Sequence, residues 1–143
     1  MAVKLSVMVE GLKWVCANNT VYINIKKNTL INLADPSIAL ELSEDALTEI
    51  EENKEDCIEL PSWKQVDTKK IAKNYVESLP DGAVKARLEK ALKGLFPMKK
   101  FHKEIEIFEY TDNWYNYRSM ALKNIAINFL NIKKIEFEDD ISY

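Results

Sequence analysis

VYINIKKNTLINLA, residues 21–34, alternates apolar and polar side chains on either side of a polar turn. Val21, Ile23 and Ile25 stand at every second position, which is the period of a strand with one buried face. Apolar residues resume after the turn, where Asn28 can supply the left-handed backbone conformation that a tight connection needs. The stretch predicts a β-hairpin, so the fold is not all helical.

Two further strands are predicted outside the hairpin. Residues 57–60 read as a strand that stops at Pro61, because proline has no N–H to donate to a neighbouring strand. We expect this strand to join the hairpin, since an isolated hairpin is marginal in water. Residues 134–138 could add a short C-terminal strand.

The rest of the chain predicts helices, because apolar residues recur there at spacings of three and four. Only 3 glycines and 4 prolines interrupt this pattern, which favours helix-rich structure. In the helix that starts after Asp81, we expect Leu88, Leu92 and Leu95 to face inward. The predicted fold is α+β, with about six helices packed on a small antiparallel sheet of about three strands. A length of 143 residues predicts a single domain, 1–143.

Composition restricts the class of protein. The 47% of hydrophobic and 30% of charged residues are typical of a soluble globular chain, and the net charge of −3 gives no general attraction to nucleic acid or membranes. The first residues show no signal-peptide pattern, and no segment is apolar enough to span a bilayer. Cys16 and Cys57 stand far apart, so we expect two reduced, buried thiols in a cytoplasmic protein.

The residues give little support to catalysis. His102 is the only histidine and lies among lysines, so we expect a surface residue and no Ser-His-Asp or Cys-His arrangement. No phosphate-binding glycine motif is present, and no metal site or cofactor is predicted. An enzyme is therefore not the favoured class.

Charge is segregated along the chain. Residues 41–56 hold eight acids and one base, while residues 85–103 hold seven bases and one acid. The helical pattern places the seven cations opposite the apolar faces, where they could contact phosphates. They are Lys85, Arg87, Lys90, Lys93, Lys99, Lys100 and Lys103. Six of the seven are lysines, which lack the planar fork that reads guanine, so sequence-specific DNA recognition is disfavoured. The simpler interpretation is two solvated helix faces that could complement each other.

Residues 112–130 crowd aromatic side chains and Arg118 into the start of a helix. At 100° per residue, Tyr115 and Arg118 fall on the same inward stripe as Leu122. Arg118 could stack on Trp114 and pair with a carboxylate, which would make it a structural clamp. The alternative is a pocket in which Arg118 and the tyrosines bind an anion.

The order of several short motifs resembles a known family. The motifs are Glu59-Leu60-Pro61, Ser78-Leu79-Pro80-Asp81 and the run Trp114, Tyr115, Tyr117, Arg118, Ala121, Leu122, Ile125 and Ala126. Together they resemble uncharacterised protein family 0158 over nearly the whole chain. The resemblance implies a single bacterial domain and brings no activity, cofactor or catalytic residue with it. Residues 96–103 depart from the family, with Met98, Lys99 and Lys100 where relatives tend to have an aromatic residue and arginines.

Three functional hypotheses remain open. We favour a small non-enzymatic cytosolic module that binds another macromolecule, with a protein as the expected partner. The first alternative is a nucleic-acid-associated accessory protein that uses the basic segment 85–103. The second is an enzyme or small-ligand binder centred on Trp114, Tyr115 and Arg118, with Tyr117 nearby.

Overall fold

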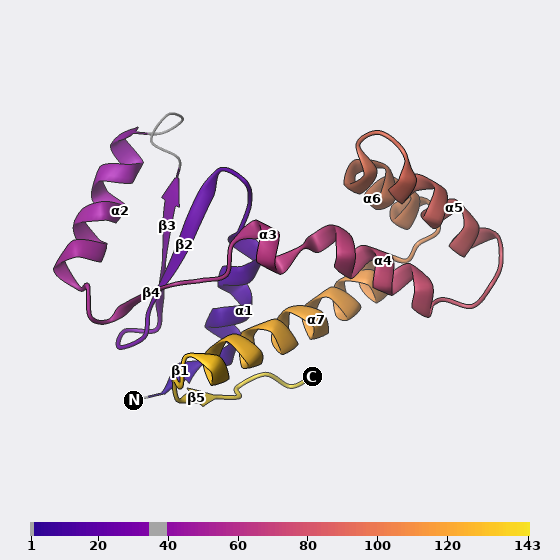
Figure 1. The fold of residues 1–143 in the computed structure, drawn as a ribbon. Helices are drawn as coiled ribbons and strands as arrows, with labels where there is room; N and C mark the ends of the chain where they lie inside the picture. Colours follow the sequence, from indigo (N-terminus) through magenta and orange to yellow (C-terminus); the bar gives the residue numbers. More distant parts are fainter. Residues whose placement is uncertain (1, 35–39) are drawn as a thin grey trace. The chain divides into compact units, whose positions relative to one another are not determined.

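The computed structural model describes the backbone of residues 2–34 and 40–143, and the side chains of 2–34 and 44–143 (Figure 1). Five strands and seven helices lie in this part of the chain. Their order is β1 (Val3–Lys4), α1 (Leu5–Trp14), β2 (Asn19–Asn24), β3 (Thr29–Ala34), α2 (Leu40–Glu52), β4 (Cys57–Glu59), α3 (Trp63–Val66), α4 (Thr68–Ser78), α5 (Ala83–Lys93), α6 (Pro97–Ile107), α7 (Thr111–Ile132) and β5 (Phe137–Glu138). The α+β prediction is confirmed, since six of these helices have ten or more residues and α3 adds a single turn.

The three-stranded sheet is antiparallel, with β2 between β3 and β4. Val21 and Ile23 are buried on β2, as the alternating pattern predicts, but Asn24 is 0% exposed on the predicted polar face and Ile25 lies after the strand. The hairpin turn contains Asn28 in the left-handed conformation at φ 54°, which confirms its predicted role. Asn28 also binds the N-terminal segment, because its Oδ1 accepts from the Lys4 N–H at 2.7 Å.

The C-terminal strand is shorter than predicted and does not join the antiparallel sheet. The strand was predicted over 134–138, but β5 covers only Phe137–Glu138 and pairs in parallel with β1, apart from the antiparallel sheet. The residues before β5 complete the end of α7 instead: Lys134 is left-handed at φ 57°, and the Ile135 N–H bonds to the Leu130 carbonyl at 2.9 Å.

The helices α1 and α2 pack against the sheet, α1 on β2 and β3 and α2 on β3. Gly11 brings α1 close, because a Cβ atom there would lie 2.6 Å from a methyl of Leu60 and 2.7 Å from one of Leu30. Asp140, after β5, accepts from both the N–H and the hydroxyl of Ser6 at the start of α1. These two bonds lower the pKa of the Asp140 carboxyl.

Residues 67–121 form a compact unit of helices around an aromatic cluster. The Trp114 ring lies 4.9 Å from the ring centroid of Phe101 and 5.2 Å from that of Tyr75, both edge to face. The helix α5 packs against both α4 and α6. Asp67 caps α4, as its type and position favour, by accepting from the Lys70 N–H at 3.2 Å.

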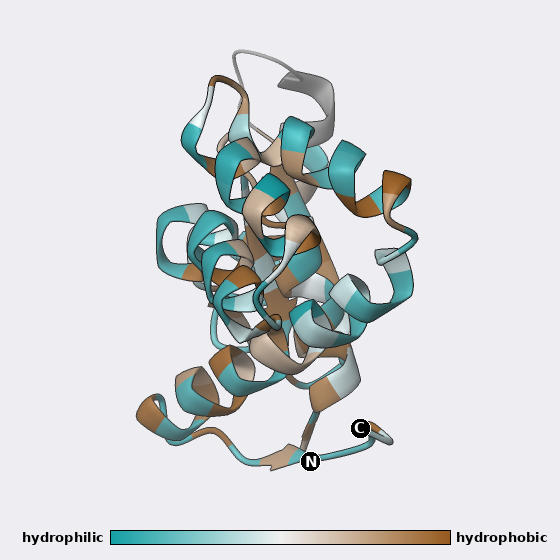
Figure 2. Ribbon diagram, turned by 90° about the vertical axis from the view of Figure 1, so that its right-hand side faces the viewer, coloured by the Kyte–Doolittle hydropathy of each residue, from teal (hydrophilic) through white to brown (hydrophobic). Residues whose placement is uncertain are grey.

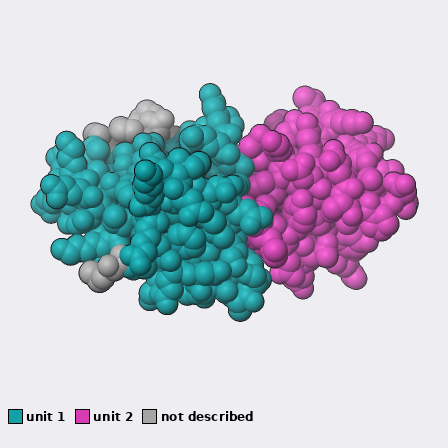
Figure 3. Space-filling view, turned by 60° about the horizontal axis from the view of Figure 1, so that its bottom comes forward, with its two compact units in different colours: residues 1–66, 122–143 teal, residues 67–121 magenta. Residues whose placement is uncertain are grey.

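The remaining described residues form the other compact unit, within 1–66 and 122–143, so the helical unit is inserted into it along the chain (Figure 3). The long helix α7 begins in the inserted unit and ends in the other one. That both units behave as a single domain, 1–143, stays a prediction.

Two expectations about burial are wrong. Leu95 is 78% exposed, because α5 ends at Lys93 and Leu95 falls in the turn after it. Cys16 is exposed and free, since it lies just after α1, whereas Cys57 on β4 is half-buried. Coloured by hydropathy, the helices alternate hydrophilic and hydrophobic stretches (Figure 2), as expected of helices that bury one face.

Candidate functional site

A groove between α5 and α6 collects most of the predicted cationic residues. Its walls are two rows with helical spacing. The first is Arg87, Lys90 and Ala91 on α5 with Gly94 directly after the helix and Lys93 beside the row, and the second is Lys100, Lys103, Glu104 and Ile107 on α6. Residues three, four and seven apart lie on one helix face, so neighbouring helices bring these rows together. The groove has a volume of about 720 Å³.

The charge of the groove is strongly positive. Five cations line it against one carboxylate, that of Glu104. The four lysines are exposed, and none of them lies within ion-pair distance of a carboxylate of the described residues. Unpaired cations that surround a concave surface raise the local concentration of anions.

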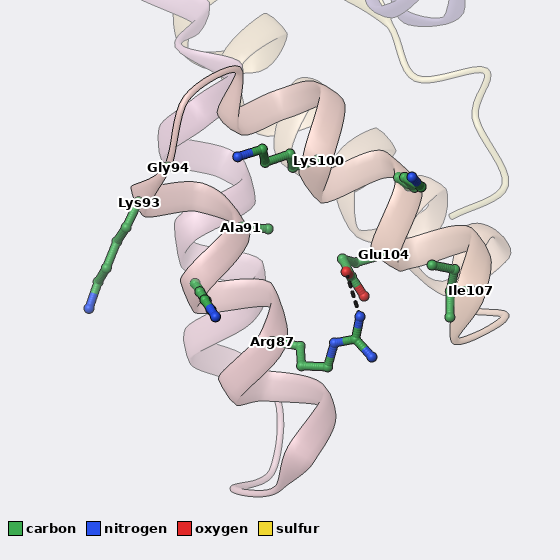
Figure 4. Close-up of a pocket in the computed structure, with 9 residues that line it drawn as sticks. Arg87, Ala91, Lys93, Gly94, Lys100, Glu104 and Ile107 are labelled. Carbon is green, nitrogen blue, oxygen red and sulfur yellow. Dashed lines mark hydrogen bonds and ion pairs between the residues drawn. The ribbon is translucent and has the colours of Figure 1, made fainter.

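Arg87 is the one cation of the groove that is held in place. Its Nη2 donates to Glu104 Oε1 at 2.8 Å (Figure 4). Its guanidinium carbon lies 5.4 Å from the ring centroid of Phe108. The second oxygen of Glu104 is buried without a partner among the described residues. Arg87 therefore ties α5 to α6, while the lysines around it are free to meet a ligand.

Lys100 lies along α6 toward the end of α5 (Figure 4). A Cβ atom on Gly94 would be 3.3 Å from the Lys100 amine, so the glycine leaves room for this close approach. In the same view Lys93 extends away from α6. The groove thus holds one lysine near the end of α5 and another at its outer edge.

Two of the seven predicted cations lie outside the groove. The Lys85 amine lies 3.3 Å from the carboxylate of Asp81, which precedes it by four residues. Lys99 is exposed but is not among the groove residues, because it precedes the row that starts at Lys100. Glu104 and Ile107 were not predicted as site residues, although the same helical spacing that links the lysines includes them.

The start of α7 differs from the predicted arrangement. Tyr115 was predicted on the inward stripe but is 49% exposed, whereas Trp114 is 1% exposed. The buried stripe runs in steps of four from Trp114 through half-buried Arg118 to Leu122. Tyr117 is half-buried, with its ring 5.2 Å from that of Tyr75. The indole of Trp114 packs in the aromatic cluster with Phe101 and Tyr75, so the buried face of α7 starts one residue earlier than predicted.

Arg118 lines a second cavity, of about 220 Å³. The other lining residues are His102, Ile105 and Glu106 from α6 and Thr111, Trp114 and Tyr115 from α7. No carboxylate of the described residues lies within ion-pair distance of Arg118, and the structural clamp stays a prediction. The carboxylate and aromatic partners expected for Arg118 belong to Arg87 instead.

His102 is exposed on the edge of this second cavity, with its ring 6.3 Å from that of Trp114. Its neighbours lower its pKa, first by excluding water from part of the ring and second through the positive charge of Arg118. A hydrogen bond with the Met98 backbone and the charge of Glu106 act in the opposite direction. The net lowering favours a neutral imidazole at pH 7.

Other classes of site receive no residues from the described chain. It contains no cluster of three or more His, Cys, Asp or Glu side chains that could hold a metal ion. Among the described helices, none combines the length and apolarity needed to cross a membrane.

Comparison with known proteins gives a family and no activity. No curated protein and no solved structure matches the chain. Residues 16–142 match the uncharacterised protein family UPF0158. Since this match covers most of the chain, the protein belongs to the family UPF0158.

Proposed function

We propose that this protein is a non-enzymatic, cytoplasmic binding module whose groove between α5 and α6 binds an acidic segment of a partner protein. The observation that supports it is the set of five cations around one groove with a single carboxylate, which Arg87 already occupies. The four free lysines offer point charges to carboxylates that approach from solvent.

Exposed apolar residues beside the lysines favour a protein partner. Ile107 lines the groove and is 54% exposed, and Leu95 and Phe96, directly after Gly94, are 78% and 73% exposed. Large apolar side chains beside charges are typical of protein interfaces, where they fill pockets on the partner. An acidic segment that also carries apolar residues fits this surface.

A second candidate function is association with nucleic acid through the same groove. The exposed Phe96 ring favours it, because bases can stack on an aromatic ring while lysines contact the phosphates. This candidate and the first make the same use of the lysines but differ in the probe that binds.

The test is a pair of titrations by fluorescence anisotropy at about 0.1 M salt, one with a labelled poly-glutamate peptide and one with labelled single-stranded and duplex oligonucleotides. Lys90→Gln with Lys100→Gln should weaken peptide binding by about tenfold, since each lost contact costs about 0.7 kcal/mol or more. The matched control is Lys85→Gln with Lys99→Gln, which removes the same charge from the same two helices outside the groove.

The control should change affinity by less than about twofold, because salt screens exposed charges over a distance of about 10 Å. Equal losses in the two double variants would contradict the groove and leave only diffuse attraction. Tighter binding of the oligonucleotides than of the peptide, lost in the groove variant alone, would favour the second candidate. Binding of neither probe would remove both.

A further inference from the structure

The cavity around Arg118 is a separate feature from the cationic groove and shares no residue with it. It lies between one face of α6 and the first two turns of α7, within the helical unit. Its inner wall is apolar, since Ile105 is 2% and Trp114 1% exposed. Its remaining residues are polar or charged.

Four side chains that line this cavity have donors with no acceptor among the described residues. Arg118 makes no ion pair and no side-chain hydrogen bond there, and the Trp114 Nε1–H is buried without a partner. The hydroxyls of Thr111 and Tyr115 likewise take part in no side-chain hydrogen bond of the described chain. A half-buried guanidinium and a buried indole N–H both gain free energy when an acceptor reaches them.

We infer that this cavity binds a small oxyanion, a carboxylate or a phosphate group, with Arg118 as its principal ligand. The planar guanidinium matches two oxygens of either group in a bidentate arrangement. The hydroxyls of Thr111 and Tyr115 supply further donors at the same cavity. A volume of about 220 Å³ suits an anion of few heavy atoms and not a nucleotide.

The two titratable neighbours leave room for such a ligand. His102 is neutral at pH 7 and so can donate or accept a hydrogen bond without adding charge. Glu106 is exposed, so water screens its repulsion, and its oxygens can accept from a hydroxyl or ammonium group of the ligand. Arg118 is the cation that determines the sign of the site.

The experiment follows the indole of Trp114, which forms part of the cavity. In a variant with Trp14→Phe and Trp63→Phe, both exposed in the parent chain, Trp114 is the only tryptophan. Titration with sodium phosphate and, separately, sodium acetate at constant ionic strength should shift its Nε1–H resonance in a saturable way. The anion that saturates at the lower concentration identifies which of the two oxyanions the site prefers.

Arg118→Gln should weaken this binding by roughly tenfold or more, because it removes a charge-assisted pair of hydrogen bonds. Lys69→Gln is the control, since it removes one exposed positive charge of the helical unit outside both the cavity and the groove, and it should leave the affinity within about twofold. Equal weakening by both variants would overturn the inference. The absence of a saturable shift with either anion in the protein that keeps only Trp114 would overturn it as well. The titration of the protein that keeps only Trp114 tests anion binding even if Arg118→Gln does not fold.

Discussion

The two arginines of the chain have opposite surroundings. Arg87 is exposed, yet its guanidinium lies 2.8 Å from a carboxylate oxygen of Glu104 and 5.4 Å from the ring centroid of Phe108. Arg118 is half-buried beside Trp114 and has neither partner among the described residues. A paired arginine fixes structure, whereas an unpaired one beside a cavity is available to a ligand.

Glu104 has a double role in the groove that a single substitution separates. Glu104→Gln should lower the free energy of unfolding by less than about 1 kcal/mol, because the pair with Arg87 is partly exposed and glutamine keeps an acceptor. The same change should strengthen poly-glutamate binding by roughly threefold to fivefold, since a like charge at contact distance in water costs about 1 kcal/mol.

Urea unfolding and peptide anisotropy measure the two effects on one protein preparation. The control is Glu89→Gln, an exposed acid of α5 that does not line the groove. It should change neither quantity appreciably. Weaker peptide binding in the Glu104 variant would show that the ion pair orders the groove more than its charge opposes an anion.

At the scale of helices and strands, predictability from sequence follows the length of the repeating pattern. The hairpin pattern repeats over several residue pairs, so the hairpin is predicted correctly. The spacing of the cations repeats over several helical turns, so five of the seven predicted cations line one groove. The pair β1 and β5 has two residues in each strand, too few for any period to be read. The predicted buried face of α7 differs from the observed one by one residue, because Trp114 and Tyr115 have similar hydropathy and only the cluster with Phe101 and Tyr75 distinguishes them.

One side-chain hydrogen bond joins α4 to α7 inside the helical unit, beside the ring contacts of Tyr75. Tyr75 is 2% exposed, and its hydroxyl donates to Asn113 Oδ1 at 2.5 Å. Tyr75→Phe should cost about 1 kcal/mol of unfolding free energy, the net value of one such hydrogen bond. Tyr115→Phe is the control, since its exposed hydroxyl should contribute less than about 0.5 kcal/mol.

The same substitution has a defined dependence on pH. Burial raises the pKa of Tyr75 from 10.0 to about 12. Between these two values the unfolded chain releases the phenol proton before the folded protein does, so this contribution to stability is complete below pH 10 and lost toward pH 12. The gap between parent and Tyr75→Phe in urea midpoints should therefore shrink above pH 10, and a constant gap would contradict the assignment.

At the scale of the whole molecule, α7 contributes residues to both compact units. Trp114 belongs to the helical unit of residues 67–121, while Leu122, Ala126 and Leu130 of the same helix are buried in the other unit. A helix that frays in one unit loses hydrogen bonds at the boundary of the other. We therefore expect both units to unfold together, as the prediction of a single domain requires.

The measurement is a urea titration followed by two-dimensional NMR. Amide signals of Val21 and Ile23 report on the sheet, and those of Ala72 and Leu88 on the helical unit. Their midpoints should coincide in the parent chain. Ala121→Pro, at the boundary inside α7, removes a helical hydrogen bond at a cost of about 3 kcal/mol and should split the midpoints, with the helical unit unfolding first. Ala121→Gly keeps the N–H and should lower both midpoints together by the smaller cost of about 1 kcal/mol. Separate midpoints in the parent would mean that the continuous helix does not make the two units one cooperative domain.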